Sequence, residues 1–92
     1  MAVIMISDVP GADADLIDGL RAAGVVEAMA AFPGFVSHVS GATETGYRVV
    51  EVWDSATAHQ AWFDAHIAPT LPPGVETTPP QYIDVALTVP ET

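Results

Sequence analysis

The amino-acid sequence predicts an α+β domain of the ferredoxin-like class, in which a four-stranded antiparallel sheet is built in the order βαββαβ. Four β-branched apolar runs and two runs of helical spacing follow one another in that order, with glycine and proline between them. Ninety-two residues suit one domain, so residues 1–92 are expected to fold as a single unit. The chain has no cysteine, so its stability must come from packing and not from disulfide bonds.

The first part of the chain is expected to contain a strand and a helix. Residues 2–8 (AVIMISD) are apolar and β-branched, and the Pro10-Gly11 pair that follows ends the strand. A helix begins at about Asp13 or Asp15, because an early carboxylate suits the positive end of the helix dipole. Gly24 can split this helix, and residues 25–32 continue it as far as Pro33.

The second part of the chain is expected to contain a hairpin, a helix and a last strand. Residues 35–40 and 47–53 are rich in valine and aromatic side chains, and residues 41–46 between them form a glycine-bounded loop. Ser55 can cap a second helix that runs to about Ile67, before Pro69 stops it. The proline-rich residues 71–80 form an ordered loop, and residues 82–89 form the last strand.

The charge balance excludes several kinds of partner. Twelve acidic residues face two arginines and no lysine, so the formal net charge is −10. A chain this acidic is not expected to bind nucleic acid or an anionic membrane surface. No segment is long enough to span a bilayer, and the apolar N-terminus has no basic residue before it, so it is interpreted as a strand and not a signal peptide. The expected location is the cytoplasm.

Strand alternation places the chemically active side chains of the hairpin on one face of the sheet. If Gly41 and Gly46 close the loop, Ser40 lies opposite Tyr47, His38 opposite Val49, and Val36 opposite Glu51. One face then carries Val36, His38, Ser40, Tyr47, Val49, Glu51 and Trp53, and the other carries Phe35, Ser37, Val39, Val50 and Val52. The second face is expected to pack against the helices, and the first is expected to line a pocket on the bare side of the sheet.

His38 and Glu51 are the candidate catalytic residues. They are predicted to be diagonal neighbours, within reach of a direct or water-mediated contact. A neutral imidazole is suited to proton transfer at physiological pH, and a nearby carboxylate can orient it or accept the proton itself. The alternatives are that His38 is a hydrogen-bonded structural residue and that Glu51 is an edge-exposed or dimer-contact carboxylate.

The candidate substrate-binding residues are mostly aromatic: Tyr47, Trp53, Trp62, His66 and Tyr82. The alternative for the tryptophans is core packing, and for the tyrosines it is packing at a strand end. His59, Phe63 and His66 form a stripe on the second helix that is interpreted as surface or dimer rim, from which His66 could reach the pocket mouth. Histidines seven residues apart do not form the adjacent pair that metal sites prefer, so no metal site is predicted.

The hairpin and second helix resemble a known family. The segments PGFVSH (residues 33–38) and GYRVVEVWDS (residues 46–55) are similar to motifs of the dimeric α+β-barrel superfamily that includes the antibiotic biosynthesis monooxygenases, and more narrowly to small actinobacterial proteins of that group. The resemblance implies that two subunits pack their bare sheet faces into an eight-stranded barrel. It also implies a small-molecule pocket in each subunit, either between the sheet and its helices or in the barrel interior.

The resemblance also allows haem degradation to be tested at three positions. Haem-degrading members resemble this chain in having a tryptophan at the position of Trp62. They have an asparagine where this chain has Ser7, and their haem-ligating histidine matches Leu71, with His66 five residues too early. Two of the three positions differ, so this chemistry ranks below the others.

Three function classes therefore follow from the resemblance. The first is a cofactor-independent oxygenase, cyclase or isomerase acting on an enolisable aromatic or polyketide-like substrate, with His38 as the base, Glu51 as its orienting residue and the aromatic residues as the ring-holding wall. The second is a binding protein with the same pocket and no turnover. The third is haem binding. The expected partners are a small-molecule substrate and a second copy of the chain, and no cofactor is expected for the first class.

Overall fold

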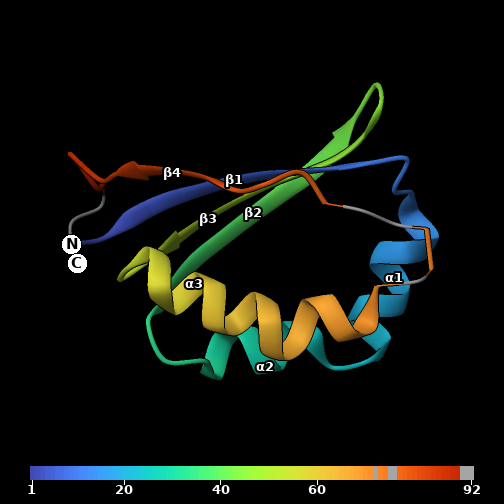
Figure 1. Cartoon of the computed structure of the whole chain (residues 1–92), viewed down its shortest axis with the longest axis horizontal. Coiled ribbons are helices and arrows are strands. Elements are labelled where there is room, and N and C mark those ends of the chain that lie inside the picture. The colour runs from blue at the N-terminus through green and yellow to red at the C-terminus, as the bar shows by residue number, and fades with distance from the viewer. Residues whose placement is uncertain (72, 75–76, 90–92) are drawn as a thin grey trace.

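The computed structural model describes residues 1–71, 73–74 and 77–89, and it shows a sheet covered on one face by helices (Figure 1). The strands β1 (Val3–Pro10), β2 (Phe35–Thr43), β3 (Gly46–Trp53) and β4 (Gln81–Asp84) pair antiparallel in the order β2-β3-β1-β4. The helices α1 (Ala14–Ala22), α2 (Val25–Ala31) and α3 (Ala56–Trp62) all lie on the same side of this sheet. This is the α+β, ferredoxin-like class that the sequence predicts.

The helix boundaries follow from local capping and from one glycine. Ser55 Oγ accepts a hydrogen bond from the Ala58 amide at 3.1 Å and caps α3 as predicted. Of the two predicted starts of the first helix, Asp13 and Asp15, the structure adopts Asp13, whose carboxylate accepts a hydrogen bond from the Leu16 amide at 3.1 Å. Gly24 has φ of 83°, a left-handed conformation that separates α1 from α2. Helix α3 continues as a π-helical turn, η1 (Phe63–Ile67), and a 3₁₀ turn, η2 (Ala68–Thr70).

The predicted boundaries of the hairpin strands and the predicted end of the last strand are wrong. The hairpin strands extend to Thr43 and from Gly46, so a two-residue turn replaces the predicted loop of residues 41–46. Strand β4 ends at Asp84, whereas residues 82–89 were expected to be extended throughout. The predicted stop at Pro90 lies outside the described residues. None of the helices in the described part of the chain is both long and apolar enough to cross a membrane.

The shorter turn shifts the hairpin register by two residues. His38 lies directly opposite Glu51, and Ser40 lies opposite Val49, so the predicted pairs of His38 with Val49 and Ser40 with Tyr47 are wrong. An even shift keeps the side chains of β3, and those of β2 after the bulge described next, on their predicted faces of the sheet. A β-bulge between Phe35 and Ser37 adds one residue to β2, which moves Phe35 to the face of Trp53.

The assignment of the two sheet faces to helices and solvent is also wrong. The face with His38, Glu51 and Trp53 lies under the helices, where Trp53 packs with Trp62 of α3 and with Phe32 after α2. The valine-rich face is uncovered, with Val39 66% exposed. A tryptophan contributes far more buried apolar area than a valine, and this difference favours burying the face that carries it.

Gly46 offers a sharp test of the close packing at the start of β3. A Cβ added there would lie 2.3 Å from the carbonyl oxygen of Val9 and 2.7 Å from the amide nitrogen of Gly11, and these backbone atoms belong to the neighbouring chain segment. We expect Gly46→Ala to lower the free energy of unfolding by roughly 1–3 kcal/mol, the usual cost of overpacking. Urea denaturation measures it, with Gly41→Ala as the control, because a Cβ at Gly41 meets no atom within 4 Å. Equal midpoints for the two variants would contradict the packing described here.

Candidate functional site

A cavity of about 690 Å³ lies between the sheet and the helices. Its apolar wall comes largely from helices α1 and α2, with Leu16, Leu20 and Met29, and its polar wall comes from β2, β3 and α3. The volume falls in the range of about 300–1,000 Å³ that small-molecule sites occupy. The sequence places the pocket on the bare side of the sheet, whereas this cavity lies on the helical side and within one chain.

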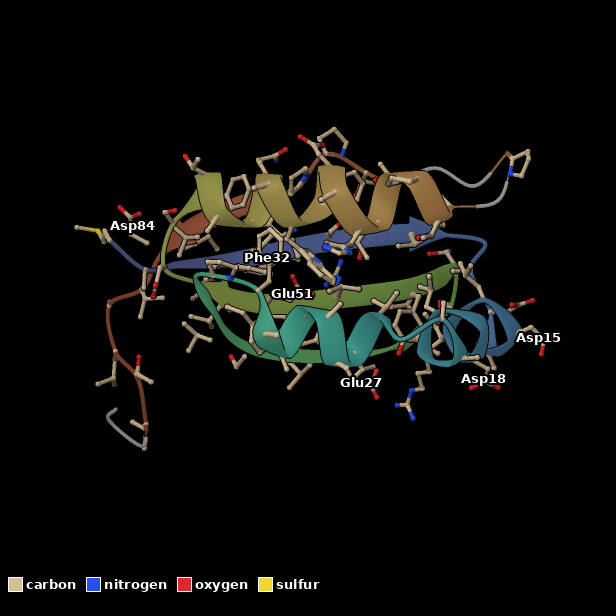
Figure 2. All side chains as sticks on the ribbon, turned by 90° about the horizontal axis from the view of Figure 1, so that it is seen from below. Asp15, Asp18, Glu27, Phe32, Glu51 and Asp84 are labelled. Carbon is tan, nitrogen blue, oxygen red and sulfur yellow. The ribbon has the colours of Figure 1, made fainter. Side chains whose placement is uncertain are left out.

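Glu51 is the centre of the polar wall. In Figure 2 its side chain is seen on the sheet through the gap between α2 and α3, near the middle of the molecule, whereas Asp15, Asp18 and Asp84 lie at the periphery. The residue is only 4% exposed, and both carboxylate oxygens are occupied. His38 Nδ1 lies 2.6 Å from Oε2, and the Trp53 indole Nε1–H donates to Oε1 at 2.8 Å. A buried carboxylate with two such partners is a hydrogen-bonded group and not an edge-exposed one.

The contacts of His38 determine which of its ring nitrogens can act as a base. A carboxylate can only accept, so in the neutral imidazole Nδ1 carries the proton that is donated to Glu51. Nε2 is then an acceptor, and it lies 2.8 Å from Ser40 Oγ, which in turn lies 3.0 Å from the Tyr47 hydroxyl. The hydroxyls therefore form a short chain that ends on the basic nitrogen. All four residues line the cavity.

A second histidine lies on the other side of Glu51. His59 of α3 is 3% exposed and lines the cavity, and its Nδ1 lies 2.7 Å from the Tyr82 hydroxyl. Gln60 Nε2–H donates to the same hydroxyl at 2.6 Å. His59 Nε2 lies 3.9 Å from Glu51 Oε1, which is an ion-pair distance but too long for a hydrogen bond.

The burial of His59 controls its charge. Desolvation lowers the pKa of His59 below the ordinary histidine value, and the carboxylates of Glu51 and Asp64 oppose this effect only in part. Burial also raises the pKa of the Tyr82 hydroxyl, which keeps its proton available for donation. His59 is therefore a neutral imidazole near pH 7.

The lowered pKa of His59 predicts a pH dependence of stability. The unfolded chain takes up a proton on this residue at about pH 6.5, whereas the folded protein resists it, so stability is lost as the pH falls below about 6.5. Denaturation midpoints between pH 7.5 and 5 measure this loss, and we expect a smaller loss in His59→Gln, which cannot be protonated. Identical pH profiles for the two proteins would show that His59 is not held neutral.

Sequence reasoning assigned His59 to the surface stripe with Phe63 and His66, and that assignment is wrong for His59. One signal could have found it. His59 lies three residues before Trp62, so the two share a helix face, and Trp62 is 1% exposed in the core. A histidine on the buried face of the helix opposite a carboxylate-bearing strand is a candidate site residue.

The remaining predicted residues divide between the cavity wall and its surroundings. Tyr47 and Trp62 line the cavity. Trp53, Tyr82 and His66 are not among its lining residues: Trp53 is fully buried beside Glu51 on β3, Tyr82 contacts His59 Nδ1, and His66 stacks on Trp62 with ring centroids 4.6 Å apart.

The two arginines of the chain have different surroundings. Arg48 forms a bidentate pair with Asp8, at 2.7 and 3.1 Å. This pair lies on the sheet face that points away from the cavity. Arg21 is exposed and lines the cavity edge.

The described residues of the cavity offer no three-ligand metal site and do not match the haem-site positions of the resemblance. Among the described residues no group of three or more histidine, cysteine or carboxylate side chains could hold a metal. Ser7 and Leu71, at the positions that the haem-degrading resemblance singles out, both line the cavity, and Leu71 has no ligating atom. Both nitrogens of His38 are hydrogen-bonded and His66 stacks outside the lining, so among the described histidines only His59, whose Nε2 makes no hydrogen bond, has a ring nitrogen left to face the space.

Comparison with protein families gives one match. The family model described as antibiotic biosynthesis monooxygenase matches residues 1–67, which include β1 to β3, the helices that cover them and most of the polar wall. A search of curated proteins finds no match.

Solved structures with the same fold include proteins of different chemistry. A variant of SnoaB, a cofactor-independent oxygenase from Streptomyces nogalater, has a TM-score of 0.63 and 20% identity, with 98% of each chain covered. The heme-degrader MhuD from Mycobacterium tuberculosis, with two hemes bound in its active site, has a TM-score of 0.60 and 26% identity, covering 95% of this chain and 98% of MhuD. At 20% identity the likeness to SnoaB concerns the fold alone.

Proposed function

Because the chain belongs to the antibiotic biosynthesis monooxygenase family, we propose that it is a small-molecule tailoring enzyme that works without a cofactor. The proposed activity is that of a monooxygenase, or of a cyclase or isomerase, on an enolisable aromatic or polyketide-like substrate bound in the cavity. The observation that carries this proposal is the ordered contact from Ser40 through His38 to Glu51, inside a largely apolar cavity of about 690 Å³.

His38 is the proposed general base. Its Nε2 accepts the substrate proton, either directly or through the Ser40 hydroxyl that now occupies this nitrogen at 2.8 Å. Glu51 accepts the Nδ1 hydrogen bond throughout, so it holds the ring and stabilises the imidazolium that forms. The Trp53 N–H fixes the carboxylate from the other oxygen. The base is thus held in one orientation and one tautomer before substrate arrives.

The substrate anion is the species that reacts further. In an oxygenase reaction the electron-rich carbanion attacks molecular oxygen, the substrate itself supplies the electrons, and one oxygen atom is retained while the other leaves as water. In a cyclase or isomerase reaction the same anion attacks a carbonyl of the substrate or is reprotonated elsewhere. Tyr47 and Trp62 provide aromatic surface for the ring, and Trp53, His66 and Tyr82 act from outside the lining as supports.

We also propose that the protein is a homodimer through the uncovered face of its sheet. Val36, Val39 and Ile83 on or beside this face are 45%, 66% and 42% exposed, which is apolar area that a second copy can cover. Analytical ultracentrifugation tests this proposal, and a stable monomer at micromolar concentration would count against it. A cytoplasmic location is also proposed. It is supported by the pairing of the apolar N-terminal run with both β3 and β4 as strand β1.

A binding protein without turnover is the second candidate, since the same cavity can hold a ligand without reacting with it. Haem binding is the third candidate, because the structure of the chain is similar to that of the heme-degrader MhuD. Titration with haem and measurement of the Soret band separate it from the others.

The decisive experiment measures oxygen and product together. Chelator-treated protein is incubated with a panel of enolisable hydroxy-ketones fused to aromatic rings, with an oxygen electrode and ¹⁸O₂ labelling read by mass spectrometry. Labelled product supports the oxygenase, and unlabelled isomerised or cyclised product supports the cyclase or isomerase. Saturable quenching of tryptophan fluorescence with no product from any member would favour the binding protein.

A further inference from the structure

The proposed mechanism uses one imidazole and leaves a second one in the same cavity without a role. His59 lies on the opposite side of Glu51 from His38, near carboxylate oxygen Oε1 where His38 contacts Oε2. It is 3% exposed and lines the cavity. Burying an imidazole removes its contacts with water, so a buried histidine is expected to use both nitrogens in hydrogen bonds.

The hydrogen bonds around Tyr82 favour one tautomer of His59. Gln60 Nε2–H donates to the Tyr82 oxygen, so the single hydroxyl proton of Tyr82 is available for His59 Nδ1 at 2.7 Å. Nδ1 is then the acceptor of a neutral ring, and the proton of the imidazole is on Nε2. Second-sphere contacts of this kind commonly select the tautomer of a functional histidine.

The N–H at Nε2 lacks a close acceptor. Its nearest carboxylate oxygen, Glu51 Oε1, is 3.9 Å away and already accepts from Trp53 at 2.8 Å. Within residues 1–71, 73–74 and 77–89, no side chain forms a hydrogen bond with this nitrogen. A cavity-lining donor that is oriented from behind and left without an acceptor is arranged to meet an oxygen atom of a ligand.

We propose that His59 Nε2–H donates a hydrogen bond to a second oxygen of the substrate, a carbonyl conjugated with the group that His38 deprotonates. This inference rests on the proposed function of His38 and adds a second point of recognition to it.

The chemistry of this pair balances without an oxidant. The substrate O–H or C–H bond breaks, an N–H bond forms at His38 Nε2, and the electron pair stays on the substrate. Conjugation moves that charge onto the distant carbonyl oxygen, where the His59 N–H stabilises it. A preorganised neutral donor in a largely apolar cavity stabilises such an oxyanion more strongly than water does. Glu51 separates the two imidazoles and keeps each in its own role.

Two isomeric probes test the inference without requiring catalysis. In 4-nitrophenol the phenolate charge is conjugated onto the nitro oxygens, whereas in 3-nitrophenol it is not. We expect His59→Phe, which keeps a ring and removes the donor, to weaken binding of 4-nitrophenolate by roughly 10- to 100-fold, the value of one charge-assisted hydrogen bond. Binding of 3-nitrophenolate should change less than about twofold. Absorbance titration of the bound phenolates and calorimetry measure both effects.

Three further variants make the result specific. His59→Gln keeps an amide N–H near the position of Nε2 and should restore most of the preference for the 4-isomer. Tyr82→Phe removes the hydroxyl that donates to His59 Nδ1, so His59 can adopt either tautomer. The preference for the 4-isomer should then fall in part. An equal loss for both isomers in His59→Phe would show a purely structural role and overturn the inference, as would a wild-type protein that binds 4-nitrophenolate no better than His59→Phe does.

The same titration separates the inference from the proposed base. His38→Asn should raise the pH at which both bound probes ionise, by the same amount for each isomer. If His38→Asn leaves ionisation unchanged while His59→Phe still loses the isomer preference, the base assignment fails and the donor assignment holds. If His38→Asn shifts the ionisation while His59→Phe keeps the isomer preference, the donor assignment fails and the base assignment holds.

Discussion

His38→Ala is expected to abolish most turnover, with a fall in kcat of roughly 10²- to 10⁴-fold, the usual contribution of a positioned general base. The reason is geometric. Nε2 is the basic nitrogen because the Nδ1 proton is held by Glu51 at 2.6 Å, and Ser40 and Tyr47 offer only hydroxyls in its place. Since the ring touches the reacting proton and not the bulk of the ligand, KM should change much less than kcat.

His38→Asn is the matched control for the alanine variant. Its amide N–H can still donate toward Glu51, so the buried carboxylate keeps a partner, but an amide has no basic nitrogen. We expect this variant to unfold at nearly the wild-type urea concentration and to be as inactive as His38→Ala. Wild-type kcat in either folded variant would remove His38 from the mechanism.

Trp53→Ala is expected to lower the free energy of unfolding by about 3–5 kcal/mol. Trp53 is fully buried, contacts Phe32, Phe35 and Trp62, and donates its indole proton to Glu51. Its removal therefore creates a cavity in the core and also takes one donor from a buried carboxylate. A domain of this size has a total stability of roughly 5–15 kcal/mol, so the variant should be unfolded in part at 37 °C.

Urea denaturation followed by circular dichroism measures this loss. Trp53→Phe separates its two causes, because it keeps most of the apolar contact and removes only the N–H, and it should lie between wild type and Trp53→Ala. Thr57→Ala, on the exposed surface of α3, should shift stability by less than about 0.5 kcal/mol. A Trp53→Ala midpoint close to that of Thr57→Ala would mean that this indole is not the centre of the core.

The contact between His38 and Glu51 could be anticipated, whereas its exact register could not. Alternation alone puts both side chains on one face, and a shift of two residues keeps them there. The predicted turn is closed by Gly41 and Gly46, and the two-residue turn of the structure gives a register that differs from the predicted one by two residues. The structure adopts the shorter one, so His38 lies directly opposite Glu51 and not diagonal to it.

The side of the sheet that carries the cavity was harder to predict. By composition alone, a face that mixes histidine and glutamate with aromatics is less suited to helix packing than a face of valines. In the structure the polar groups satisfy one another, with Glu51 accepting from both His38 and Trp53, so burying them leaves no orphaned charge. This pairing depends on distances across two strands, which no single segment of sequence contains.

The order of elements, the helix caps at Asp13 and Ser55, the break at Gly24 and the shared face of His38 and Glu51 were determined by the sequence itself, because each depends on residues close together along the chain. The cavity beneath the helices, the neutral His59 behind Glu51 and its support from Tyr82 were decided only by the tertiary structure. These features depend on how α3 and β4 lie against β3, and packing sets that arrangement through contacts between residues more than twenty positions apart.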